Sequence, residues 1–141
     1  MNILKRLPSR FEALPEFFSF LDVQLKQELN LSHDLLFHVK LVLEEALTNA
    51  IKHGNKFDPD RHVEVKISVK GDRLVMRVKD EGAGFDFERL PDPTLQERLM
   101  RISGRGVFLI RQLMDEVSFH DGGREIRMVM QLSRKSRPGK A

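Results

Sequence analysis

EEALTNAIKHGN, residues 44–55, is the stretch that decides how this chain folds. It continues an apolar pattern of helical period, yet seven of its twelve residues are polar or charged. Glu45 and Asn49 are four residues apart, so their side chains project from one side of a helix, one turn apart. A solvated helix face would account for them. So would a site for Mg²⁺ on phosphates, because this ion takes only one or two oxygens from the protein.

The first half of the chain predicts one short strand and two helices. Residues 2–8 form the strand, and residues 14–30 form the first helix. Ser32 is a suitable N-cap for the second helix, which Gly54 and Asn55 end in residue types that tolerate a left-handed cap. The apolar stripe of the second helix comprises Leu35, Val39, Val42, Leu43, Ala46, Ala50 and Ile51.

The second half predicts two hairpins separated by a loop and a helix. Apolar and polar residues alternate on either side of the Gly71-Asp72 turn, and again on either side of the DGG turn at 121–123. Prolines and glycines mark residues 90–106 as a loop with a short helical piece, and residues 107–117 follow as a compact helix. Hairpins favour a largely antiparallel sheet, and helices with an apolar stripe must cover it. The element order therefore predicts an α/β (α+β) two-layer sandwich.

Length and composition exclude several classes of protein. The 141 residues suit one domain, here residues 1–133, and a hydrophobic content of 40% can supply its core. The chain has no cysteine, no leader-like apolar run and no stretch of membrane-spanning length, so we expect a cytoplasmic protein without membrane contacts. The tail, residues 134–141, carries much of the basic excess and is expected to be disordered. The sequence lacks the basic stripe that a nucleic-acid-binding protein carries, so we expect no direct binding to nucleic acid.

Asp80 combines a charge with a buried position. It continues the apolar period of residues 74–78, so its carboxylate should leave the sheet on the core side. Burial of that charge is unfavourable unless donors surround it, and backbone N–H groups are the structural solution. Gly82 and Gly84 follow in DEGAGFD and permit another group to approach the backbone closely. The carboxylate therefore also suits an exocyclic amine, such as that of adenine.

A second glycine pair, Gly104 and Gly106, directly precedes the helix of residues 107–117. The free N–H groups and the dipole at a helix start favour an anion such as phosphate, although a plain loop-to-helix joint has the same pattern. The sequence contains no Walker A motif, dinucleotide fingerprint or set of eukaryotic-type protein-kinase motifs. The histidines indicate no metal site, because His33 and His38 lie on different helix faces.

These three segments, in this order, resemble the N, G1 and G2 boxes of the GHKL ATPases, which include gyrase and the histidine kinases. Spacing and size are most similar to the small bacterial anti-sigma-factor serine kinases of the RsbW type, over residues 3–132. The resemblance implies the Bergerat fold, a mixed, mostly antiparallel sheet with helices on one face. It also implies transfer of the γ-phosphoryl group of ATP to a serine of a STAS-domain anti-anti-sigma protein. Such kinases alternately hold that protein or a sigma factor, and they often form homodimers.

The same resemblance assigns roles to individual residues. Glu45 would be the general base, Asn49 would coordinate Mg²⁺, and Asp80 would accept a hydrogen bond from the adenine amine. Residues 91–103 would form the lid over ATP, and either Arg101 or Arg105 would steady the γ-phosphate. The remaining nucleotide-binding residues are Gly82 and Gly84 for the base, and Gly104, Arg105 and Gly106 for the phosphates.

One departure from the family pattern concerns adenine. The family commonly has a threonine near the start of the last strand, where this chain has Arg124 and Glu125. Adenine recognition then rests on Asp80, Thr48 or water, or the nucleotide affinity is lower.

Two other functions stay open. One is a non-catalytic, nucleotide-dependent module that sequesters a sigma factor or another regulator; the other is a detached histidine-kinase ATPase domain, although this chain shows no phosphoacceptor helix pair.

Overall fold

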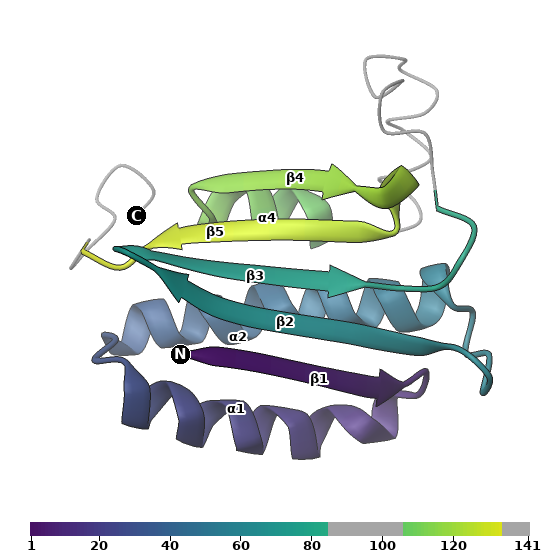
Figure 1. The fold of residues 1–141 in the computed structure, drawn as a ribbon, viewed down its shortest axis with the longest axis horizontal. Coiled ribbons are helices and arrows are strands. Elements are labelled where there is room, and N and C mark those ends of the chain that lie inside the picture. Colours follow the sequence, from purple (N-terminus) through teal and green to yellow (C-terminus); the bar gives the residue numbers. More distant parts are fainter. Residues whose placement is uncertain (85–105, 134–141) are drawn as a thin grey trace.

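A five-stranded sheet forms one layer of the molecule. The structure is a computed structural model that describes residues 1–84 and 106–133. The strands are β1 (Asn2–Pro8), β2 (His62–Lys70), β3 (Arg73–Lys79), β4 (Glu116–His120) and β5 (Glu125–Gln131). They lie in the order β1-β2-β3-β5-β4, and within the described residues every neighbouring pair is antiparallel (Figure 1). The sheet that was expected to be mixed and mostly antiparallel is fully antiparallel in this part of the chain, because β5 lies between β3 and β4, the two strands that run in the same direction.

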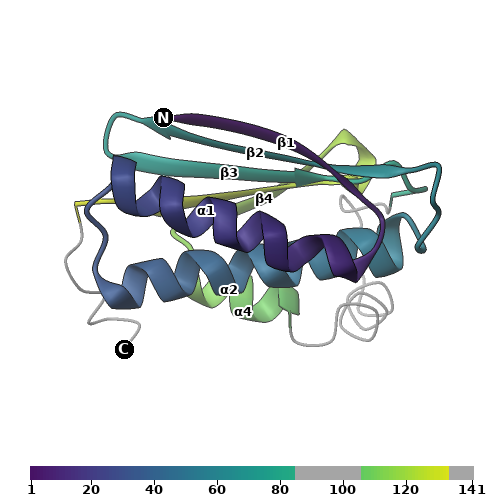
Figure 2. The same cartoon turned by 90° about the horizontal axis from the view of Figure 1, so that it is seen from below.

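The second layer consists of helices, and α1, α2 and α4 all lie on one face of the sheet (Figure 2). The helical elements are the 3-10 turn η1 (Phe11–Ala13), α1 (Leu14–Glu28), α2 (His33–Asn49), the π-helical turn η2 (Ala50–Gly54), α4 (Gly106–Leu113) and the 3-10 turn η4 (Asp121–Gly123). The predicted two-layer sandwich and the N-cap are confirmed, since the Ser32 hydroxyl accepts a hydrogen bond from Leu35 N at 3.2 Å. None of the described helices has the length and apolar character that a membrane span needs.

Apolar side chains between the two layers form the core. Every residue of the predicted α2 stripe is buried. The strand residues that face the core lie an even number of positions apart, as one face of a sheet requires, and Val75 and Val129 are buried as well, on the other face of β3 and β5. From the sheet, the core receives Ile3, Leu7, Val63, Val65, Ile67, Leu74, Met76, Val78, Ile126, Met128 and Met130. This packing holds α2 under the sheet and so fixes the polar residues at its C-terminal end.

The C-terminal end of α2 differs from the prediction. The chain leaves the α-helix through the π-helical turn η2, and Asn55 keeps right-handed dihedral angles (φ −84°, ψ −13°). The left-handed residues are instead Lys56 (φ 54°) and Phe57 (φ 58°). The predicted left-handed cap at Gly54 and Asn55 is therefore wrong. Tertiary contacts override the local preference, because Gly54 packs against Asp80 and Asn55 is fully buried.

Several predictions fall on residues 85–105 and 134–141, which lie outside the described residues. They concern the lid at 91–103, the phosphate-binding Gly104 and Arg105, and the disordered tail. These points stay predictions.

Candidate functional site

The N-terminal end of α4 lies against the polar face of α2. A Cβ atom placed on Gly106, the first residue of α4, would be 2.6 Å from Glu45 Oε2 and 3.3 Å from Asn49 Nδ2. Only a residue without a side chain lets the backbone approach these groups so closely without displacing them. The N–H groups of the first helical turn have no partner within the helix, and the helix dipole is positive there. A carboxylate, a carboxamide and a helix N-terminus therefore come together from distant parts of the chain.

A second group of residues surrounds Asp80, directly after β3. Its carboxylate points toward the helix layer, as the strand period predicts, and a Cβ atom on Gly54 would overlap it. A Cβ atom on Gly82 would in turn overlap the carbonyl group of Gly54. Gly82 also donates its N–H to Asp80 Oδ1 at 2.8 Å. The two glycines thus form a seat for the carboxylate, which side chains at these positions would fill.

The surroundings of Asp80 perturb its titration. Burial raises the pKa of the Asp80 carboxyl above its usual range, while the Gly82 N–H and the positive charges of Arg124 and Arg61 oppose that rise. The one hydrogen bond that the described residues give this carboxylate comes from Gly82. A carboxylate that is partly desolvated and can still accept hydrogen bonds is typical of a binding site.

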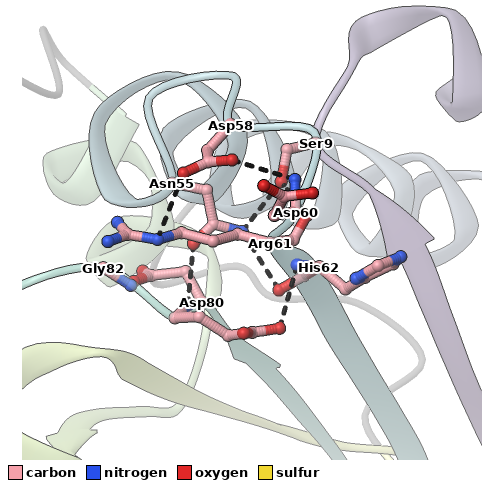
Figure 3. Close-up of polar contacts among 9 residues, drawn as sticks. Ser9, Asn55, Asp58, Asp60, Arg61, His62, Asp80 and Gly82 are labelled. Carbon is pink, nitrogen blue, oxygen red and sulfur yellow. Dashed lines mark hydrogen bonds and ion pairs between the residues drawn. The ribbon is translucent and has the colours of Figure 1, made fainter.

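Asn55 joins the Asp80 turn to the rest of the fold, as Figure 3 shows. Its side chain is fully buried, and Nδ2 donates to Ser9 Oγ at 2.9 Å and to the His62 carbonyl at 3.0 Å. Its Oδ1 atom accepts from Glu81 N at 2.7 Å. The carboxamide therefore makes three hydrogen bonds, and each of them goes to a different segment of the chain.

The Asn55 amide replaces one rung of the β2–β3 ladder. Glu64 lies opposite Lys79, so the same register would place His62 opposite Glu81. Instead of a direct backbone-to-backbone bond between these two residues, the amide accepts from the Glu81 N–H and donates to the His62 carbonyl. The Glu81 side chain completes the arrangement, because its Oε1 atom accepts from His62 N at 2.9 Å. The two strands therefore separate where the seat of the carboxylate begins.

Comparison with known proteins identifies the family of the chain that carries these two groups of residues. The profile of the histidine kinase-like ATPase domain matches residues 7–130. The chain belongs to this family. It is similar to the serine-protein kinase RsbW of Listeria monocytogenes, with 30% identity over 140 aligned positions that cover 92% of this chain and 89% of the relative. RsbW of Bacillus subtilis is 31% identical over 116 positions, covering 74% and 71% of the two chains.

A relative named as an anti-sigma factor also supports this family assignment. The anti-sigma F factor of Anoxybacillus flavithermus is 32% identical over 117 positions, covering 79% of this chain and 80% of the relative. The resemblance to the GHKL superfamily and to its RsbW-type members is therefore confirmed. The five antiparallel strands with helices on one face are consistent with the Bergerat fold of the histidine kinase-like ATPases.

The described residues fit the ATP that a histidine kinase-like ATPase domain implies, and they would fit a Mg²⁺ ion bound with it. They contain no group of three or more His, Cys, Asp or Glu side chains that could hold a metal ion alone. The Asn49 carboxamide lies beside a helix N-terminus instead, and Mg²⁺ accepts one or two protein oxygens when phosphates and water supply the others. The Asp80 carboxylate, which lies between Gly54 and Gly82, can accept a hydrogen bond from the amine of a nucleotide base. The Asn49 carboxamide thus suits a metal ion that takes most of its ligands from the phosphates of the nucleotide and from water.

The predicted site residues fall into two groups in this family member. Glu45, Asn49 and Gly106 form the first, and Asp80, Gly82 and Gly84 belong to the second. Sequence reasoning missed the roles of Gly54, Asn55 and Arg124. A glycine and an asparagine directly after the N box were the available signals for the first two, but an ordinary helix cap explained both. Arg124 was visible only as a departure from the family pattern.

Proposed function

We propose that this protein is an ATP-dependent serine-protein kinase that also acts as an anti-sigma factor. The observation that carries the proposal is the close approach of Gly106 to Glu45 and Asn49, which brings a carboxylate and a carboxamide to a helix start suited to phosphate, where they would serve as base and metal ligand. The names of the relatives, serine-protein kinase and anti-sigma F factor, support it. A kinase that draws on ATP and regulates transcription acts in the cytoplasm.

Each residue has a defined task in this proposal. Asp80 accepts from the adenine amine, Asn49 supplies an oxygen to Mg²⁺, and the N–H groups at the start of α4 bind phosphate. The residues that shape the pocket are Gly82 and Gly84 around the base and Gly104, Arg105 and Gly106 around the phosphates. Mg²⁺ held by Asn49 would neutralise charge on the phosphates, and phosphoryl transfer depends mainly on such neutralisation and on positioning.

Glu45 acts on the incoming hydroxyl group. Its carboxylate takes the proton as the serine oxygen bonds to the γ-phosphorus, while the bond from that phosphorus to the bridging oxygen of ADP breaks. A positioned general base contributes about 10²- to 10⁴-fold to such a step. The serine belongs to a STAS-domain anti-anti-sigma protein, and phosphorylation releases that protein so that the kinase binds a sigma factor, with a homodimer as the working assembly.

Phosphotransfer from radiolabelled ATP to the STAS partner tests the proposal. Glu45→Gln should lower the transfer rate by about 10²-fold or more and leave ATP binding intact. Glu44→Gln is the matched control, because Glu44 is the adjacent residue and its side chain is exposed. The control should phosphorylate the partner at the wild-type rate.

The other outcomes identify the competing functions. Equal rates for the two variants would remove Glu45 from the reaction. Binding of ATP and sigma factor without transfer to any partner would indicate a non-catalytic module. Transfer to a histidine would indicate a histidine-kinase ATPase domain. A nucleotide titration with and without Mg²⁺ tests the metal requirement separately.

A further inference from the structure

Arg124, the residue before β5, holds the turn that carries Asp80. Its Nε–H group donates to the Gly82 carbonyl at 2.7 Å, and Nη2 donates to the Ala83 carbonyl at 3.2 Å. Its Nη1 atom donates to the Asp121 carbonyl at 3.0 Å. The carbonyl of Arg124 itself accepts from Asp80 N at 3.0 Å. One residue thus connects the turn after β3 to the connection between β4 and β5.

Two glycines beside this arginine keep the connection tight. Gly84 (φ 75°) and Gly122 (φ 64°) both have left-handed dihedral angles. A Cβ atom on Gly84 would overlap the Gly122 carbonyl, and one on Gly122 would be 2.9 Å from Arg124 Nη1. The guanidinium therefore donates hydrogen bonds to two backbone segments, the turn after β3 and the connection between β4 and β5. These segments pack too closely for a side chain to fit between them. A planar fork of N–H donors can bond several carbonyls at once, whereas a lysine ammonium lacks that fixed geometry.

We propose that Arg124 is a positioning and specificity residue for the nucleotide base: it holds the Asp80 turn so that the carboxylate accepts from a 6-amino purine and disfavours a 6-oxo purine. The inference rests on the proposed function, because it concerns the base of the nucleotide that the kinase would use. An ionised carboxylate only accepts hydrogen bonds. The 6-amino group of adenine donates, whereas the 6-oxo group of hypoxanthine is a second acceptor, and two facing acceptors repel each other.

Arg124 also acts on the charge of Asp80. Burial raises the pKa of the Asp80 carboxyl, and among the described residues the Gly82 N–H, Arg124 and Arg61 lower it while Asp121 raises it. Loss of the arginine removes a positive charge and so raises this pKa further. A protonated carboxyl can donate and therefore tolerates a 6-oxo group. The base preference of a variant without Arg124 should weaken, most strongly toward acid pH.

Isothermal titration calorimetry with ATP and with inosine triphosphate tests the inference from about pH 5 to 8. Arg124→Gln should lower the preference for ATP over inosine triphosphate by about tenfold, because one hydrogen bond to a charged group no longer discriminates. Arg124→Lys keeps the charge without the fork, so it should bind both nucleotides more weakly and keep the wild-type pH profile. Arg127→Gln is the matched control, since this arginine lies on β5 and pairs with Glu116.

A measurement without nucleotide gives a second readout. NMR titration should find a higher pKa for Asp80 in Arg124→Gln than in the wild-type protein, and no change in Arg127→Gln. Thermal unfolding verifies that each variant is folded. If Arg124→Gln does not fold, Arg124→Lys decides, and wild-type affinity for ATP in that variant would overturn the inference.

The failures of the two proposals are distinguishable. An identical base preference in wild type and folded Arg124→Gln at every pH would overturn this inference and leave the proposed function intact. If the folded wild-type protein binds neither nucleotide, the proposed function fails and the inference fails with it.

Discussion

Replacing Asn55 with alanine should destabilise the fold strongly and loosen the turn that carries Asp80. The substitution removes three hydrogen bonds of a fully buried amide. It also leaves the His62 carbonyl and the Glu81 N–H without the group that joins their strands. Direct pairing should not simply resume, because in the wild-type fold the Asn55 amide lies between these two backbone groups.

The magnitude follows from these contacts. Each hydrogen bond contributes about 1 kcal/mol net, and each buried group left without a partner costs about 1–3 kcal/mol. Since these terms overlap, we expect the free energy of unfolding to fall by about 3–5 kcal/mol. Domains are stable by only about 5–15 kcal/mol, so this is a large fraction of the total. At about 2–4 °C per kcal/mol, the melting temperature should fall by about 10 °C.

Urea unfolding measures the loss, and Asn30→Ala is the matched control because Asn30 is exposed. The control should stay within about 0.5 kcal/mol of the wild-type protein. Hydrogen exchange adds a local readout, since the Glu81 amide should lose its protection in the Asn55 variant before the amides of the central strands do. A loss below about 1 kcal/mol, or a Glu81 amide that stays protected, would show that Asn55 does not replace a ladder rung.

Two further predictions separate stability from activity. Gly106→Ala should leave the free energy of unfolding within about 1 kcal/mol of the wild type, because alanine favours a helix and its Cβ meets the ends of two side chains, those of Glu45 and Asn49, which can move aside. Phosphotransfer should still fall by about 10²-fold, because the general base is displaced; an unchanged rate would contradict this. Asp80→Asn should stabilise the nucleotide-free protein at neutral pH, because the raised pKa means that folding disfavours the charged form. Urea unfolding at several pH values should show no gain below the ordinary pKa of 3.8, a gain that grows from there up to the raised folded-state pKa, and a constant gain above it, since only the wild type loses stability in that window.

Periodicity predicted most of the fold because it reports local geometry. Strand residues alternate with period two and α2 repeats at helical spacing, so the sequence alone located the elements and the Ser32 cap. The exit from α2 was not predictable in this way. The π-helical turn and the left-handed residues Lys56 and Phe57 follow from tertiary contacts, because Gly54 must meet Asp80.

The site was predicted in part for the same reason. Motif order placed Glu45, Asn49 and Asp80 as candidates, but only the packing of α2 beside α4 shows how close Gly106 comes to the first two. Arg124 required the actual turn, because its hydrogen bonds go to carbonyl groups, which every residue has. Backbone acceptors leave no trace in the sequence.

Asp80 lies where the β2–β3 ladder is interrupted, and this position explains why two side chains must hold its turn. A continued ladder would hold the turn by backbone bonds, but it would also carry the chain straight on past the carboxylate seat. Asn55 replaces the missing rung from the core side, and Arg124 bonds the turn from the partly exposed side. Their loss should therefore have unequal effects. Asn55→Ala should mainly lower the free energy of unfolding, since a buried amide is lost, whereas Arg124→Gln should mainly lower nucleotide affinity and base preference, since water can replace the guanidinium at the exposed Ala83 carbonyl.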